Sequence, residues 1–213
     1  MQRSRLLTVV AGAVAAFAVA APVPAQMLDS SVLSAFRWRN VGPSNFMGRV
    51  SDVQGIPGPS KTLYVAAAGG GIWKSNNNGI TWRPIFDDKD VAAFGMLAIA
   101  PSDTNIIYAG TGEPNSRNTI EPGNGMYKST DGGAHWTHIG LVNSQHIGRI
   151  QVDPRNANTV YVAALGPAWK AGGERGLYKS TDGGTTWKLI KAGANDRTGA
   201  IDVQLDPSNP DVV

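Results

Sequence analysis

Five side chains have the chemistry of a ligand site, namely Arg49, Glu113, Arg117, Arg149 and Trp169. Two guanidinium groups in one place hold a carboxylate or a sulfate through paired hydrogen bonds, and an exposed indole offers a stacking surface. Glu113 lies between a glycine and a proline and is the candidate catalytic carboxylate. Each residue also has a structural interpretation, in which the arginines pair with neighbouring carboxylates, Glu113 braces its loop and Trp169 packs against the protein.

Two other acidic residues, Asp131 and Asp182, belong to a repeated turn. Segments 71–82, 125–136 and 176–187 align without gaps and share Gly, Lys, Ser, a second Gly and Trp at fixed offsets. Asx side chains accept backbone N–H bonds inside turns, glycine supplies the positive φ, and the Trp packs beneath the turn. The repeat therefore assigns a structural role to Ser75, Asn77, Gly79, Trp82, Ser129, Asp131, Gly133, Trp136, Ser180, Asp182, Gly184 and Trp187.

The turn lies inside a longer repeating unit. An apolar strand with a tyrosine precedes each turn, at 63–66, 107–109 and 160–163. A further strand that opens with glycine precedes that one, at 48–50, 95–97 and 148–150, with a fourth start at 199–201. Four short strands in each repeat of roughly 50 residues predict a propeller blade, whereas a β-sandwich does not repeat one motif at one period.

The fold class predicted for residues 26–213 is therefore all-β, a propeller of four-stranded blades. Residues 38–42 resemble a last strand of a blade without its hairpin, and 199–213 resemble the beginning of a new blade. About three blades plus one strand are present, and closed propellers need about four to eight blades. The sequence thus predicts an incomplete, N-terminal part of a propeller domain.

Residues 1–25 have the pattern of a signal peptide. Arg3 and Arg5 precede an apolar run, 6–21, and small residues lead up to Ala25. The run is shorter than the span of about 20 apolar residues that a membrane helix needs, which disfavours an uncleaved anchor. We expect cleavage near Ala25/Gln26, a secreted or periplasmic protein, and no stable membrane anchor.

The composition of the chain limits the classes of partner and cofactor that we expect. Without Arg3 and Arg5, the 19 basic residues of the chain become 17 against 16 acidic ones, and no basic cluster predicts a nucleic-acid partner. The chain has no cysteine, so neither a disulfide nor a lipoprotein anchor forms. The acidic run 87–90 lacks a defined calcium-ligand pattern, and the three histidines lack metal-ligand spacing. We expect no cofactor and no metal, and a carbohydrate or a protein as ligand.

The repeated Ser-x-Asp-x-Gly-x-x-Trp pattern resembles the Asp-box, or bacterial neuraminidase repeat (BNR). That repeat occurs in sialidases, xyloglucanase-type glycoside hydrolases, sortilin-type receptors and photosystem II assembly factors. Stretches 39–43 and 108–115 are similar to exported bacterial proteins described as glycosyl hydrolase BNR-repeat or sortilin-like. The resemblance covers 36–213 and implies the propeller fold, which hosts many activities.

The resemblance does not supply a complete set of catalytic residues for this chain. In xyloglucanase-type enzymes a catalytic Asp follows the first blade's second strand, and Ala68 occupies that position here. The early Arg-Ile-Pro motif of sialidases is not reproduced by the stretch that begins at Arg83. Our first interpretation is a propeller that binds a glycan or protein; a glycoside hydrolase with a carboxylate pair is the second, and an assembly or maturation factor is the third.

Topology predicts which face holds the ligand. In an up-and-down blade, the connections between the second and third strands and those between blades lie on one face. These are the long, unlike loops 83–94, 110–124, 138–147 and 164–175, and we call this surface the long-loop face. The repeated turns lie on the opposite face, which we call the turn face. We expect Arg49, Arg149, Glu113 and Arg117 to contact a ligand on the long-loop face.

Overall fold

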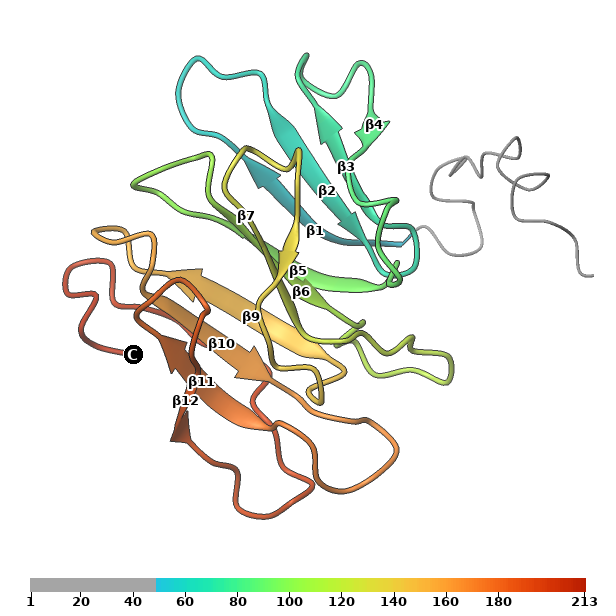
Figure 1. The fold of residues 1–213 in the computed structure, drawn as a ribbon, viewed down its shortest axis with the longest axis vertical. Helices are drawn as coiled ribbons and strands as arrows, with labels where there is room; N and C mark the ends of the chain where they lie inside the picture. Colours follow the sequence, from blue (N-terminus) through green and yellow to red (C-terminus); the bar gives the residue numbers. More distant parts are fainter. Residues whose placement is uncertain (1–48) are drawn as a thin grey trace, which may run out of the picture. The chain divides into compact units, whose positions relative to one another are not determined.

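The computed structural model describes residues 49–213, which form three four-stranded antiparallel sheets and no helix (Figure 1). The first sheet contains β1 (Val50–Gly55), β2 (Leu63–Ala67), β3 (Ile72–Ser75) and β4 (Arg83–Pro84). The second contains β5 (Phe94–Ile99), β6 (Ile107–Thr111), β7 (Met126–Ser129) and β8 (Thr137–His138). The third contains β9 (Ile147–Val152), β10 (Val160–Ala164), β11 (Gly176–Ser180) and β12 (Lys188–Lys191). The expected signal peptide and the expected strand at 38–42 lie outside the described residues.

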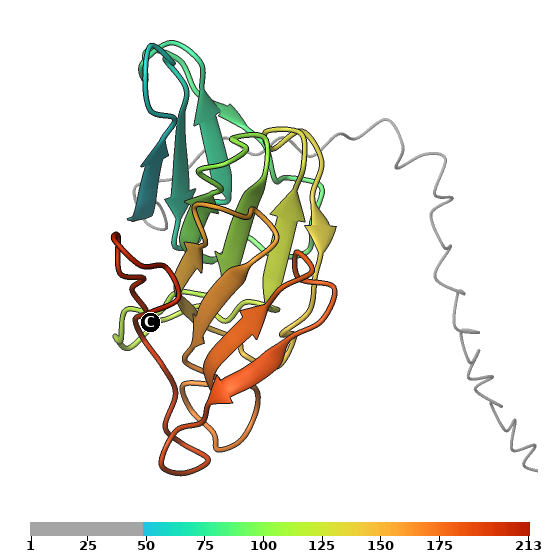
Figure 2. The same ribbon diagram turned by 90° about the vertical axis from the view of Figure 1, so that its left-hand side faces the viewer.

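Each sheet is an up-and-down meander whose strands pair in chain order, as the repeat predicts. We call the sheets blade 1, blade 2 and blade 3. The first strands of the blades, β1, β5 and β9, lie next to one another, and the blades follow one another around them (Figure 2). The all-β propeller architecture expected from the sequence is confirmed. Within the described residues, no helix has the length and apolar character to cross a membrane.

The strand register differs from the sequence alignment at one point. The sequence aligned Gly48 with Gly95 and Gly148, but the strand pairing makes Ser51 the equivalent of those two glycines, at an irregularity that recurs in β1, β5 and β9. A Cβ at Gly95 would stand 2.2 Å from the carbonyl oxygen of Ile147 in the next blade. Gly95 therefore allows blade 3 to approach closely, whereas the equivalent position of blade 1 is Ser51.

Two rows of equivalent positions follow from this register. Arg49, Ala93 and His146 precede the first strands, and each carbonyl accepts an N–H bond of 2.8–2.9 Å from the residue after the second strand. Met96 and Arg149 are equivalent positions within β5 and β9. Arg49 and Arg149, which the sequence placed at matching strand starts, therefore occupy different rows.

Residues 200–205 lie beside β9, where the first strand of a next blade is expected. The N–H of Ala200 donates to the carbonyl of Ala164 at 3.0 Å, and Val203 is buried against Tyr161 and Ala163. The segment has no strand assignment because the described residues supply no ladder partner for it. It nevertheless continues the arrangement of β1, β5 and β9.

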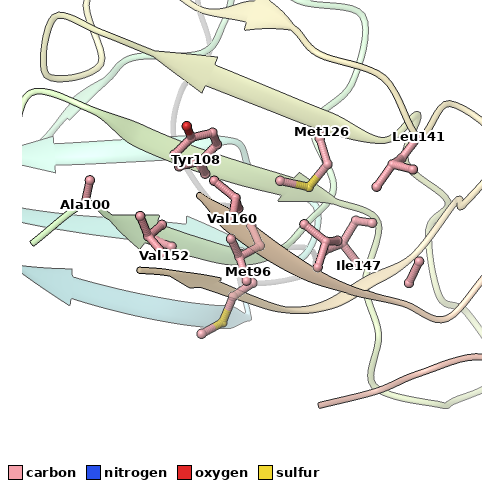
Figure 3. Close-up of a cluster of buried hydrophobic side chains, with 12 residues drawn as sticks. Met96, Ala100, Tyr108, Met126, Leu141, Ile147, Val152 and Val160 are labelled. Atoms are coloured by element: carbon pink, nitrogen blue, oxygen red, sulfur yellow. The ribbon is translucent and has the colours of Figure 1, made fainter. Parts of the chain in front are cut away.

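The apolar cores lie between blades. One cluster joins blades 2 and 3 and includes Met96, Tyr108, Met126, Ile147 and Val160 (Figure 3). A second cluster joins blades 1 and 2, where the ring of Phe86 packs edge-on against Phe94 and Tyr127, with centroids 4.8 and 5.0 Å apart. Burial of apolar surface therefore fixes each blade against its neighbour.

The repeated turns share one hydrogen-bond pattern. The N–H of Gly133 donates to Ser129 Oγ at 2.8 Å, and the N–H of His135 donates to Asp131 Oδ1 at 2.9 Å. Equivalent bonds reach Ser180 and Asp182 in blade 3, and Ser75 and the Asn77 amide oxygen in blade 1. These carboxylates are occupied inside their own turns.

The turn residues also join one blade to the next. Trp136 Nε1 of blade 2 donates to the carbonyl of Ile85 at 2.9 Å, and Trp187 Nε1 of blade 3 donates to that of Ile139 at 2.6 Å. In the same region Lys74 Nζ of blade 1 donates to the carbonyl of Gly132 at 2.8 Å. The Trp therefore reaches the neighbouring blade as well as packing beneath its own turn.

Candidate functional site

A cavity of about 430 Å³ opens on the long-loop face. It is lined by Arg49, Ala68, Gly69, Glu113, Arg117, Thr119, Ile120 and Glu121, and we call it the Glu113 cavity. Loop 110–124 of blade 2 supplies five of these eight residues, and blade 1 supplies the others. The structure thus brings together three residues selected from the sequence, Arg49, Glu113 and Arg117, and adds Ala68 to the same wall.

Loop 110–124 is fixed where it leaves β6. Gly112 has a φ of 79°, and a Cβ there would stand 1.7 Å from the carbonyl oxygen of Gln145. The Gln145 carbonyl in turn accepts the N–H of Gly123 at 2.7 Å, and the N–H of Glu113 donates to the carbonyl of Glu121 at 3.1 Å. The loop therefore interlocks with loop 138–147, and this arrangement sets the direction of Glu113.

Glu113 is buried and forms an ion pair with Arg49. The side chain of Glu113 is 2% exposed and that of Arg49 is 43% exposed. A buried carboxylate is costly unless a charged or hydrogen-bonding partner compensates it. Because Arg49 belongs to blade 1 and Glu113 to blade 2, the pair also joins the two blades across the floor of the cavity.

The rim of the cavity has charges that are available to a ligand. Arg117 Nη2 donates to Thr119 Oγ1 at 2.7 Å. Among residues 49–213, neither Arg117 nor Glu121 forms an ion pair. The guanidinium of Arg117 can donate hydrogen bonds to a ligand hydroxyl, and the carboxylate of Glu121 can accept one from it. The rim therefore provides both a donor and an acceptor for a hydroxyl group.

Two of the predicted ligand residues lie outside this cavity. Arg149 Nε donates to Asp202 Oδ1 at 2.8 Å, and this bond is the largest of the causes that lower the pKa of Asp202. Trp169 is 75% exposed, and its neighbours Ala168 and Lys170 line a separate cavity of about 410 Å³. Arg49 and Arg149 therefore do not form the paired anion site considered from the sequence, because each is engaged by a different carboxylate.

Arg175, another basic residue of the long-loop face, braces its own loop. Its guanidinium donates to the carbonyls of Leu165, Pro167, Lys170, Gly172 and Arg197. These bonds use all the donor nitrogens of the side chain, so Arg175 has a structural role.

The sequence patterns did not indicate Thr119 or Ile120 as site residues. Both follow Arg117 in loop 110–124, as does Glu121, so the length of that loop was the available signal. His146, one of the three histidines without metal-ligand spacing, is 2% exposed and lies near Glu113. Burial of a polar residue at a loop end cannot be recognised without the fold.

The fold and the cavity define three consecutive blades of a β-propeller with a polar site on the long-loop face. No family model matches the chain. The chain is similar to a xyloglucanase from Hypocrea jecorina (strain QM6a), with 31% identity over 207 residues, which cover 90% of this chain and 22% of that protein. It is also similar to a xyloglucanase from Acetivibrio thermocellus, with 30% identity over 212 residues, 93% of this chain and 24% of that protein. The chain thus spans less than a quarter of the length of these relatives.

Solved structures support the same fold. An ancestral GH74 enzyme matches with a TM-score of 0.55 and 24% identity, over 72% of this chain and 19% of that one. A structure of YCF48 bound to a D1 peptide matches with a TM-score of 0.51 and 17% identity, over 76% of this chain and 45% of that one. At these identities the likeness concerns the fold alone.

Proposed function

We propose that this chain is the N-terminal part of an exported Asp-box β-propeller that binds a carbohydrate in the Glu113 cavity. One observation carries the proposal: Arg117 and Glu121 line the cavity and form no ion pair among residues 49–213. The same cavity is lined by the ion pair of Arg49 and the buried Glu113. The similarity to xyloglucanases over at least 90% of the chain supports a glycan as the ligand.

The chemistry of the cavity suits a sugar. Its volume of about 430 Å³ is within the range of about 300–1,000 Å³ usual for small-ligand sites. Each sugar hydroxyl donates one hydrogen bond and accepts others, so a wall with a guanidinium, a carboxylate and the Thr119 hydroxyl complements it. A concave polar site favours a glycan over a folded protein, whose interface is typically much larger and flatter.

Glycoside hydrolysis is the second candidate, and one observation favours it. Glu113 and Glu121 line the same cavity, and glycosidases use two carboxylates on either side of the scissile bond. Ala68, at the position of the catalytic Asp in xyloglucanase-type enzymes, also lines this cavity and has no acid–base group. Hydrolysis by this chain would therefore depend on Glu113 and Glu121.

Titration calorimetry with a xyloglucan oligosaccharide tests binding. Arg117→Ala should weaken the affinity about tenfold or more, because hydrogen bonds to a charged group contribute about 1.5–3 kcal/mol. Lys61→Ala is the matched control, since it removes one exposed positive charge from the β1–β2 connection on the turn face. Equal affinities of wild type and Arg117→Ala would contradict the assignment of the site.

Measuring the reducing ends released from xyloglucan distinguishes a binding propeller from a glycoside hydrolase. A binding propeller leaves the xyloglucan intact, whereas a hydrolase cleaves it and loses at least about a hundredfold in rate on Glu113→Gln or Glu121→Gln. Cleavage that survives both substitutions would exclude the carboxylate pair of this cavity as its source.

A further inference from the structure

A second cavity, of about 410 Å³, lies next to the Glu113 cavity on the long-loop face. Ile120 lines both cavities, so loop 110–124 provides a wall that they share. The second cavity has three cationic lining residues, Lys170, Arg175 and Arg197, and no acidic one. We call it the Arg197 cavity. Its charge differs from that of the Glu113 cavity, which is lined by residues of both signs.

Arg175 fixes the backbone from which the other two cationic side chains extend. Its Nη2 donates to the carbonyl of Lys170 at 2.7 Å, and its Nη1 donates to the carbonyl of Arg197 at 3.2 Å. The N–H of Gly172 donates to the carbonyl of Asp196 at 2.8 Å, which joins the same two segments a second time. Lys170 and Arg197 therefore extend from main-chain positions that one guanidinium holds together.

No carboxylate neutralises this positive charge in the part of the chain that the structure describes. Lys170, Arg175 and Arg197 form no ion pair there. Glu174 lines a further cavity together with Lys170, but its carboxylate accepts the N–H of Asn143 at 2.7 Å. The bonds of Arg175 go to carbonyl oxygens, which have no net charge. An anion in the Arg197 cavity would therefore meet three cations and no competing carboxylate on its wall.

We propose that the Arg197 cavity binds the carboxylate of an acidic sugar, so that the glycan held on this face carries a uronate. A guanidinium binds a carboxylate through paired hydrogen bonds, and an ammonium adds a point charge. Trp169, between the lining residues Ala168 and Lys170, is 75% exposed and offers a sugar ring a stacking surface that an inorganic anion cannot use. The inference rests on the proposed function for the rest of the glycan, which the Glu113 cavity would hold.

Titration calorimetry on the full chain compares aldotriouronic acid, a trisaccharide with a single glucuronate, with its carboxyl-reduced, neutral counterpart. Wild type should bind the acidic sugar about tenfold or more tightly, because hydrogen bonds between charged groups are the stronger ones. The difference should shrink as NaCl is raised from about 0.05 M to about 0.5 M, since salt screens exposed charges. Equal affinities of the two sugars at low salt would overturn the inference and leave the proposed function standing.

Arg197→Gln and Lys170→Gln each remove one charge and keep a polar side chain, and both positions are exposed, so the variants should fold. Each should weaken binding of the acidic sugar about tenfold and change that of the neutral sugar by less than about twofold. Lys188→Gln is the matched control, because it removes an exposed charge from β12, which lines neither cavity. A loss in Lys188→Gln equal to that in Arg197→Gln would mean that net charge alone sets the preference, and would overturn the inference.

Glucuronate alone separates a failure of this inference from a failure of the proposed function. If neither trisaccharide and no xyloglucan oligosaccharide binds, the proposed function fails, and the amide shifts of Lys170, Arg197 and Gly199 still decide. These amides should shift saturably with glucuronate, less with inorganic sulfate and not at all with glucose. Equal responses to glucuronate and glucose, no response to either, or sulfate shifts as large as those of glucuronate would overturn a site for an acidic sugar.

Discussion

At the scale of single residues, the two partners of the Arg49–Glu113 ion pair differ in their exposure to water. Glu113 is nearly fully buried, whereas the guanidinium of Arg49 keeps access to water. Removal of the exposed partner leaves a carboxylate inside the protein, and removal of the buried charge leaves a cation that water still solvates. The two substitutions should therefore differ in their effect on stability.

Arg49→Ala should lower the free energy of unfolding by about 3 kcal/mol, at the lower end of the range for a broken buried pair because Arg49 is partly exposed. Glu113→Gln keeps the shape and one hydrogen bond to Arg49, so it should cost only about 1 kcal/mol. Urea denaturation of both variants at pH 7 measures the difference. A larger loss in Glu113→Gln than in Arg49→Ala would show that the pair is not arranged as described.

Asp131 makes the stability of the folded protein depend on pH. The backbone N–H and side chain of His135, together with Ser129, hold the pKa of Asp131 well below its usual range. A carboxyl group whose pKa is lower in the folded state stabilises that state above its unfolded pKa of about 4, and the contribution is lost as the pH falls below that value.

Asp131→Ala removes the bonds that the carboxylate makes with Ser129, Ala134 and His135. Because the side chain is partly exposed and water replaces much of this bonding, the variant should lose about 1 kcal/mol of stability at pH 7, and less at pH 3. Thermal unfolding at the two pH values checks the sign. The affinity of the folded variant for a ligand of the long-loop face should stay unchanged, because Asp131 lies on the turn face. A deficit that grows on acidification would show that the pKa of Asp131 is not lowered in the folded state.

At the scale of elements, the interlock of loops 110–124 and 138–147 depends on Gly112. Gly58, in the β1–β2 connection, has a similar positive φ of 89° but no atom within 4 Å of the position a Cβ would take. Gly58→Ala should cost about 1 kcal/mol from backbone strain alone. Gly112→Ala adds a collision with Gln145 and should cost about 3 kcal/mol or more, with loss of ligand binding. Equal costs in thermal melts would mean that the loops do not interlock.

The sequence predicts the elements well and the site only in part. The turns were predictable because each uses residues that are close in the chain, such as Ser129 and Asp131. The pair of Arg49 and Glu113 joins residues 64 positions apart in different blades, and no local pattern records it. Ser51 replaces the glycine that marks the register in the other blades, so Arg49 was aligned with Arg149 although their rows differ.

At the scale of the whole molecule, export is a prediction that rests on residues 1–25. Cleavage between Ala25 and Gln26 would leave residues 26–213 of this chain. Mass spectrometry of protein recovered outside the cytoplasm should find Gln26 at the N-terminus. An intact Met1 in a membrane fraction would instead indicate an uncleaved anchor.

We expect ligand binding and turn building to belong to opposite faces of the propeller. Chemical-shift mapping of the isotope-labelled chain during titration with a xyloglucan oligosaccharide distinguishes the two faces. The amides of Gly69, Glu113, Arg117 and Glu121 should shift together and saturate at one affinity, while those of the turns at Asp131 and Asp182 should not move. Saturable shifts confined to the turns, or no saturable shift in loop 110–124, would contradict this expectation.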